Sequence, residues 1–241
     1  MMDQLAQETA VFGIHLTPHQ LGQFAQYQAL LLEWNQRLNL TAIREPQQIQ
    51  RRHFLDALTC ATVMEGGDGR TPNESSLIDV GTGAGFPGLP LKILYPGLQL
   101  TLVESIVKKA RFLENVVSEL GLAGVIILTE RAEVVGQDSD HRGQYDWAVA
   151  RAVAEMRILV EYLLPLCQIG GSALAQKGSN ASKEAELAKN AIKVLGGAPP
   201  QLFPIQLPER EETHYLARIK KETETPSQYP RRVGIPAKRP L

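Results

Sequence analysis

Apolar positions recur at near-helical spacing in the first part of the chain. Between Pro18 and Leu38 they mark one face of an amphipathic helix. Thr17 before Pro18 is a typical helix start, because threonine caps the helix and proline needs no backbone donor in the first turn. A second helix is predicted from Gln47 to Met64. The polar, turn-rich segment from Gly66 to Ser76 is interpreted as a linker.

From Ser76 onwards, short apolar runs alternate with helical segments. The predicted strands are 76–81, 98–105, 124–130, 145–152 and 171–178, and the predicted helices are 89–96, 108–122, 155–170 and 182–195. Such alternation is typical of an α/β protein, in which helices cover both faces of a parallel sheet. Two further strands, 201–208 and 214–221, have no helix between them and predict an antiparallel edge.

This pattern predicts three units. Residues 1–70 form a helical extension, residues 71–222 form the α/β core, and residues 223–241 form a basic, Pro-rich tail. We expect the tail to be irregular and to pack on or beside the core.

Composition and charge narrow the possible functions. Hydrophobic residues make up 44% of the 241 residues and charged residues 21%, which is typical of a globular protein. The net charge of −1 argues against nucleic-acid binding by bulk charge, so such a role would need local basic patches. Cys60 and Cys167 lie in stretches interpreted as helical, and we expect both to be buried thiols in a reducing compartment. We find no signal-like start or membrane span and expect a cytoplasmic protein.

A glycine-rich stretch follows the first predicted strand. Four glycines fall within eight positions, at Gly81, Gly83, Gly85 and Gly88. Ligands of open parallel sheets bind beyond the carboxyl ends of the strands, and glycine allows close backbone approach. The pattern alone fits a dinucleotide or S-adenosylmethionine (SAM), and a tight turn without a ligand is the structural alternative.

Three acidic residues refine the choice of ligand. Asp79, two residues before the first glycine, would repel a pyrophosphate but attract the ammonium group of SAM. Glu104 ends the second strand, where an acidic residue accepts hydrogen bonds from ribose hydroxyls of either ligand. Glu133 follows the third strand and is expected to meet an adenine amine. The alternative for Glu133 is a solvated residue in the first turn of a helix.

Several motifs together resemble one known family. They are "WNQRLNLTAI" from Trp34, "HFLDAL" from His53, "DVGTGAGFPGLPLKI" from Asp79, "ERAE" from Glu130, "ARAVA" from Ala150, "QKG" from Gln176 and "YPRRVGIPAKRPL" from Tyr229. They are similar to the RsmG (GidB) family of bacterial 16S ribosomal RNA methyltransferases. The resemblance implies a Rossmann-like, class I SAM-dependent methyltransferase fold. It also implies methylation at N7 of a guanine in the 530 loop, with 16S rRNA or the small ribosomal subunit as partner.

The resemblance also implies a set of cofactor-binding positions. These are Gly81, Gly83, Phe86, Glu104, Ser105, Ile106, Ala132, Glu133 and Arg151. The family often has Asp at position 104, so Glu104 reaches one methylene further. Arg151 is expected to hold the SAM carboxylate or an RNA phosphate, and an ion pair with Asp146 or Glu155 is the alternative. We identify no other candidate catalytic residue and no metal-like Cys/His spacing.

Guanine N7 carries a lone pair and no proton, so its methylation needs alignment and no general base. The sequence lacks the Pro-Cys pair of cytosine C5 methylation and the Asp/Asn-Pro-Pro-aromatic run of amine methylation. RNA contacts are expected from basic residues, with a solvated surface as the alternative. They are Arg37, Arg44, Arg51, Arg52, Lys177, Lys183, Arg231, Arg232, Lys238 and Arg239.

We interpret His53 as a packed helix residue. We expect a monomer, and the competing functions are an NAD-dependent dehydrogenase and a non-catalytic assembly factor.

Overall fold

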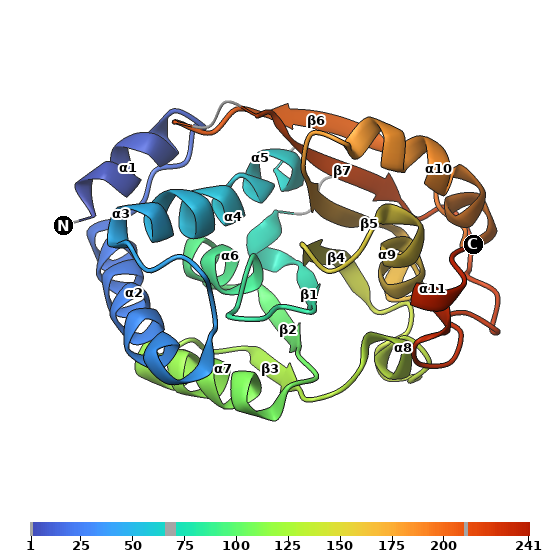
Figure 1. The fold of residues 1–241 in the computed structure, drawn as a ribbon, viewed down its shortest axis with the longest axis horizontal. Helices are drawn as coiled ribbons and strands as arrows, with labels where there is room; N and C mark the ends of the chain where they lie inside the picture. The colour runs from blue at the N-terminus through green and yellow to red at the C-terminus, as the bar shows by residue number, and fades with distance from the viewer. Residues whose placement is uncertain (1, 66–70, 210–211) are drawn as a thin grey trace.

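Seven strands form one mixed sheet in the computed structural model, which describes residues 2–65, 71–209 and 212–241. In chain order they are β1 (Ser76–Val80), β2 (Gln99–Val103), β3 (Val125–Leu128), β4 (Tyr145–Arg151), β5 (Cys167–Lys177), β6 (Gln201–Ile205) and β7 (His214–Lys220). Their order across the sheet is β3-β2-β1-β4-β5-β7-β6 (Figure 1). The first five are parallel, and β7 pairs antiparallel with both β5 and β6. The parallel sheet and its antiparallel edge are therefore confirmed.

Helices cover both faces of this sheet. In chain order they are α1 (Asp3–Ala10), α2 (Pro18–Leu38), α3 (Pro46–Ile49), α4 (Asp56–Leu58), α5 (Cys60–Met64), α6 (Gly88–Leu94), α7 (Val107–Glu119), α8 (Ala132–Val135), α9 (Met156–Leu163), α10 (Ala181–Val194) and α11 (Ile235–Lys238). Figure 1 shows α2 and α7 on one side of the sheet and α9 and α10 on the other. Successive side chains of β1 point to opposite faces of the sheet, so Leu77 packs into one hydrophobic cluster and Ile78 into the other. This explains why helices cover both faces.

The start of α2 is built as its sequence predicts. The Thr17 hydroxyl accepts a hydrogen bond from the Gln20 amide, and the Gln20 side chain accepts one from the Thr17 amide at 2.8 Å. The Gln20 side chain also donates to the carbonyl oxygens of Ile93 and Leu94 in α6. This residue therefore caps α2 and fixes the N-terminal helices against the core. Because α1–α5 and β1 share one hydrophobic cluster, the division at residue 70 stays a prediction.

The predicted helix from 155 to 170 is wrong in its second half. Helix α9 ends at Leu163, and Cys167 begins strand β5 instead of lying in a helix. Pro165 explains the end, because proline cannot donate the next helical hydrogen bond. Cys167 and Cys60 are buried free thiols, as expected.

Other element boundaries also differ from the prediction. The predicted helix from Gln47 to Met64 contains a π-helical segment, Gln50–Leu55, between α3 and α4. In the linker, Pro72–Glu74 form a 3₁₀ turn, and residues 66–70 lie outside the described residues. The tail is irregular except for α11. It lies against the core, where the Arg142 guanidinium donates to the carbonyl oxygens of Thr225 and Tyr229. Over the described parts of the chain, we find no helix with the length and apolar character to cross a membrane.

Candidate functional site

The candidate site lies where the order of the sheet changes direction. The chain runs from β1 to β2 and β3 on one side, then to β4 and β5 on the other. In open α/β sheets, ligands bind at this point, outside the carboxyl ends of the strands. The loops that follow β1 and β4 meet there: an ideal Cβ on Gly81 would lie 2.8 Å from Cγ2 of Val153.

Three glycines of the loop after β1 have left-handed backbone geometry. The φ angles are 68° at Gly81, 62° at Gly83 and 97° at Gly85. L-residues with a Cβ are strained in this region, so the loop requires glycine. At Gly81 a side chain would also collide with Val153. The close approach of a ligand to this backbone stays a prediction.

Asp79 holds this loop from inside the protein. Its carboxylate is fully buried, and Oδ2 accepts hydrogen bonds from the Thr82 hydroxyl at 2.6 Å and the Gly88 amide at 2.8 Å. The expected contact with a ligand ammonium group is therefore replaced, at Oδ2, by contacts within the loop. Oδ1 accepts no hydrogen bond from the described residues. Burial raises the pKa of Asp79 to about 6.

Glu104 connects the glycine loop to the segment after β2. Its Oε2 accepts a hydrogen bond from the Gly83 amide at 3.1 Å, and its Oε1 accepts one from the Ile106 amide at 2.8 Å. Each carboxylate oxygen can accept two hydrogen bonds and here accepts one, so both oxygens can still accept a hydrogen bond from a ribose hydroxyl. The structure thus brings Gly83 and Ile106 to Glu104, where their amides orient the carboxylate.

A cavity of about 160 Å³ lies beside Glu104, and we call it the Glu104 cavity. Five of the predicted cofactor positions line it: Gly81, Glu104, Ser105, Ala132 and Glu133. Three glutamates line it, Glu104, Glu130 and Glu133, and their carboxylates offer acceptors for donors such as ribose hydroxyls and an adenine amine. These residue types fit the nucleoside part of SAM.

Glu133 is buried, with 3% of its surface exposed, so the alternative of a solvated helix residue is wrong. Its Oε1 accepts a hydrogen bond from the Gly234 amide at 2.9 Å, and its Oε2 lies 3.7 Å from Nε of Arg131. The C-terminal tail therefore touches a residue that lines the Glu104 cavity. The contact of Glu133 with adenine stays a prediction.

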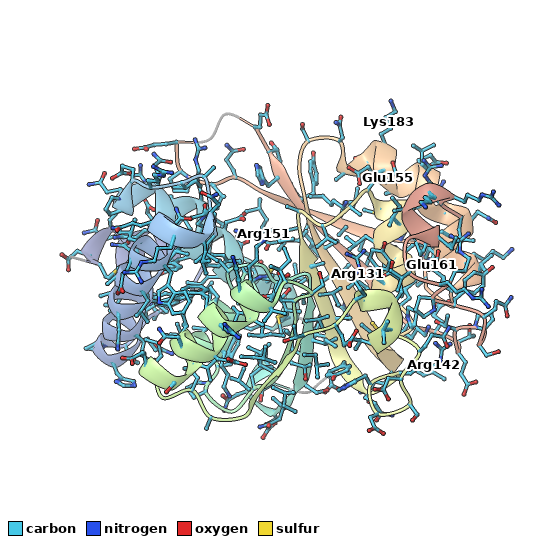
Figure 2. The ribbon with its side chains drawn as sticks, turned by 60° about the horizontal axis from the view of Figure 1, so that its bottom comes forward. Arg131, Arg142, Arg151, Glu155, Glu161 and Lys183 are labelled. Carbon is cyan, nitrogen blue, oxygen red and sulfur yellow. The ribbon has the colours of Figure 1, made fainter. Side chains whose placement is uncertain are left out.

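Phe86 and Arg151, like Gly83 and Ile106, are predicted positions that lie outside the lining of the Glu104 cavity. The Arg151 guanidinium pairs with Asp56 Oδ2 at 3.1 Å, and its carbon lies 4.7 Å from the centre of the Phe86 ring. The expected alternative partners, Asp146 and Glu155, are therefore wrong. Figure 2 shows Arg151 between the N-terminal helices and the strands.

His53 supports this arrangement in a defined protonation state. Its ring stacks on Phe86 at 4.7 Å, and its Nδ1 lies 3.2 Å from a nitrogen of Arg151. Because arginine only donates, Nδ1 accepts, and Nε2 carries the proton toward the Thr41 hydroxyl at 2.7 Å. Burial and the charge of Arg151 lower the pKa of His53 to about 3, so the ring is neutral at pH 7. His53 is packed, as expected, and it also holds Arg151.

A second cavity, of about 620 Å³, lies beside Arg151, and we call it the Arg151 cleft. Its walls include His53 and Asp56 from the N-terminal helices, and Gln176 and Lys177 from the end of β5. Val153 lines both this cleft and the Glu104 cavity, so the two cavities are adjacent.

The ten basic residues expected to contact RNA fall into two groups. Three are in ion pairs: Arg51 with Glu8 and Glu209, Lys177 with Glu184, and Arg231 with Glu161. The other seven are exposed and form no ion pair within the described part of the chain. They are Arg37, Arg44, Arg52, Lys183, Arg232, Lys238 and Arg239. Lys183 points outward from α10 in Figure 2.

Sequence reasoning missed the roles of Asp56, Gln176 and Gly234. Each meets its partner across 95 or more positions of the chain: Asp56 with Arg151, Gln176 with Asp56, and Gly234 with Glu133. All three lie within the family-like motifs, which was the only signal in the sequence that marked them. Among the described residues, no cluster of His, Cys, Asp and Glu has the geometry of a metal site.

Comparison with known proteins identifies relatives over the whole length. The family model for rRNA small subunit methyltransferase G (GidB) matches residues 20–211. Ribosomal RNA small subunit methyltransferase G of Roseiflexus castenholzii is 52% identical over 240 residues, covering 100% of both chains. The protein of the same name from Alkaliphilus metalliredigens is 46% identical over 95% of this chain and 94% of its own.

Solved structures with low sequence identity share the fold. A SAM-dependent O-methyltransferase from Thermotoga maritima superimposes with a TM-score of 0.53 at 15% identity, over 81% of this chain and 72% of that protein. Precorrin-6y C5,15-methyltransferase from Geobacter metallireducens gives a TM-score of 0.51 at 10% identity, over 69% of this chain and 87% of its own. The Rossmann-like methyltransferase fold is therefore confirmed.

Proposed function

The chain belongs to the rRNA small subunit methyltransferase G family, and from this membership we propose that it transfers the methyl group of SAM to ribosomal RNA of the small subunit. The motif resemblance supports a finer proposal, in which the acceptor is N7 of a guanine in the 530 loop of 16S rRNA. We further propose that the protein acts in the cytoplasm as a monomer.

One arrangement carries the proposal: the Glu104 carboxylate, oriented by the Gly83 and Ile106 amides, beside a cavity that Gly81 also lines. Carboxylate oxygens with spare acceptor capacity suit ribose hydroxyls, and the cavity lining has no basic side chain other than Arg131 to receive a pyrophosphate. This charge distribution favours SAM over a dinucleotide.

Bound SAM supplies a methyl group on positively charged sulfur. Guanine N7 has an in-plane lone pair and no proton, so the N7–methyl bond would form as the methyl–sulfur bond breaks, and no proton would have to be removed. The protein therefore has to align the base and exclude water. The state of His53 is consistent with a reaction that needs no general base, because its ring is neutral and both of its nitrogens are hydrogen-bonded.

A methyl-transfer assay tests the proposed function directly. Small ribosomal subunits that lack the modification are incubated with labelled SAM and the protein, and the labelled base is then mapped. We expect one labelled guanine in 16S rRNA, carrying the methyl group at N7. Binding to small-subunit RNA without label transfer would instead favour the assembly factor, and preferential binding of NADH over SAM would favour the dehydrogenase.

Glu104→Ala tests the cofactor site separately from the RNA. The substitution removes the acceptor for ribose and frees two loop amides, so we expect SAM binding to weaken by about 1–3 kcal/mol in calorimetry. Glu114→Ala on the exposed face of α7 is the control. Unchanged affinity in Glu104→Ala would refute the assignment of Glu104.

A further inference from the structure

The Arg151 cleft has the dimensions of a ligand pocket but contacts few of the predicted cofactor positions. Its volume of about 620 Å³ lies within the range of about 300–1,000 Å³ typical of small-molecule sites. It begins where β4 and β5 end side by side, with Arg151 and Gln176 paired in register. Val153 lines both this cleft and the Glu104 cavity. A molecule in this cleft is therefore next to the proposed cofactor site.

Gln176 gives this cleft a buried acceptor without a donor. The residue is 8% exposed, and its Oε1 receives no hydrogen bond from the described residues. Its Nε2 donates to the Asp56 carbonyl oxygen at 2.7 Å, which fixes the orientation of the amide. Unsatisfied buried acceptors are costly and rare, so this oxygen calls for a donor that a ligand would bring.

Asp56 supplies a second acceptor beside the first. Its Oδ2 accepts a hydrogen bond from Arg151 at 3.1 Å, while its Oδ1 receives none from the described residues. Asp56 and Gln176 are also joined by the hydrogen bond between the Gln176 side chain and the Asp56 backbone. The two free oxygens therefore belong to one connected group of residues.

The charges of the cleft do not favour a phosphate. The cleft lining carries Arg52, Arg151 and Lys177 against Asp56, Glu155 and Glu184, so its charges balance. Arg151 pairs with Asp56, and Lys177 pairs with Glu184 at 2.8 Å and donates to the Ala154 carbonyl oxygen. What the cleft offers is hydrogen-bond acceptors and the flat guanidinium of Arg151. A planar base with donor groups on one edge matches this chemistry, because bases stack on guanidinium planes and are read by hydrogen bonds to their edges.

We propose that the Arg151 cleft receives the target base, that Gln176 Oε1 accepts a hydrogen bond from the N2 amine of guanine, and that Asp56 Oδ1 accepts one from N1–H. This inference rests on the proposed methyl transfer to guanine. N7 lies on the opposite edge of the purine, so a guanine held by its N1 and N2 groups directs N7 away from these acceptors. Adenine has an acceptor at N1 and lacks the N2 amine, so the same cleft rejects it.

The test removes one donor from the RNA and one acceptor from the protein. Small subunits are assembled in vitro around 16S RNA that carries guanosine or inosine at the modified position; inosine lacks the N2 amine. For the unmodified protein we expect kcat/KM to be roughly 10- to 100-fold lower with inosine. Gln176→Leu is expected to methylate guanosine more slowly and to reduce the guanosine/inosine ratio toward one.

Three controls separate recognition from folding. SAM affinity of Gln176→Leu, measured by calorimetry, should match that of the unmodified protein. Gln168→Leu removes a side-chain amide at the other end of β5, where it donates to Asp146, and should keep the guanosine/inosine ratio. If Gln176→Leu fails to fold, Gln176→Ala is measured in the same way and is expected to lower the ratio.

Two results would overturn the inference alone: equal rates on guanosine and inosine with the unmodified protein, or an unchanged ratio in the folded variant. In both cases methyl transfer to guanosine still occurs, so the proposed function survives. No methyl transfer to either RNA by the unmodified protein would overturn the proposed function and this inference with it.

Discussion

At the scale of single residues, Gly81 is the most sensitive position of the site. Its φ of 68° favours glycine, and a Cβ would approach Val153 to 2.8 Å. We expect Gly81→Arg to abolish SAM binding and methyl transfer while the protein still folds, because the side chain would fill the Glu104 cavity. Gly121→Arg is a matched control, since Gly121 has a φ of 61° with no atom within 4 Å of its ideal Cβ. SAM binding by Gly81→Arg in calorimetry would contradict the location of the site.

The sequence predicted single residues well where their role depends on local neighbours. Gly81 and Glu104 follow the first two strands, and the parallel sheet brings strand ends together. Asp79 was placed correctly at the strand end, but its burial depends on how α6 packs over the loop. Asp56 could not be predicted as the partner of Arg151, because no local pattern encodes a contact across 95 positions.

At the scale of elements, the C-terminal tail is coupled to the cofactor site. Arg231 forms a bidentate pair with Glu161, which is fully buried, and three residues later the Gly234 amide holds Glu133. Figure 2 shows Glu161 beside α11. The basic residues of the tail were expected to contact RNA, whereas Arg231 forms an ion pair with a carboxylate in the protein interior.

Arg231→Ala tests this coupling. It leaves the Glu161 carboxylate buried without its charged partner, so we expect the free energy of unfolding to fall by about 3–5 kcal/mol in urea titrations. We also expect weaker SAM binding, because Gly234 is then no longer anchored to the core. Arg232→Ala, one residue on and exposed, is the control for stability and SAM affinity. Equal stability of the two variants would show that the tail does not depend on this pair.

Helix and strand types were easier to predict than their ends. The alternation from β1 to β5 follows from hydrophobic pattern, whereas the end of α9 depends on Pro165, inside an apolar run that reads as continuous helix. Helix α8 has four residues and no hydrophobic period long enough to detect. Its position next to Gly136 and Pro230 is set by packing with the tail.

At the scale of the whole molecule, buried Asp79 links stability to pH. Its pKa is about 6 in the folded protein and near 3.8 when unfolded, so its contribution to stability is present below about pH 4 and is lost as pH rises through 6. His53 has the opposite sign: its folded pKa of about 3 makes its contribution present above pH 6.5 and lost on acidification. Asp79→Asn removes the first effect only.

We therefore expect the free energy of unfolding of Asp79→Asn, relative to the unmodified protein, to increase by about 2 kcal/mol between pH 4 and pH 7. Urea titrations of both proteins across this range measure the difference, in which the titration of all other groups cancels. A difference that stays constant with pH would mean that the Asp79 carboxylate ionises as easily in the folded protein as in the unfolded chain.

RNA binding is also a property of the whole surface. With a net charge of −1, the molecule has no overall attraction for RNA, so binding has to come from exposed basic residues without acidic partners. Three of them, Arg232, Lys238 and Arg239, lie in the tail.

We expect the combined replacement of these three residues by Ala to weaken binding to 16S RNA. The slope of log affinity against log salt should fall by about 0.7–0.9 for each phosphate that is no longer neutralised. Lys189→Ala, which removes an exposed lysine already paired with Glu186, should leave the slope unchanged. Anisotropy titrations over a series of salt concentrations measure both slopes, and equal slopes in the two variants would exclude the tail from the RNA interface.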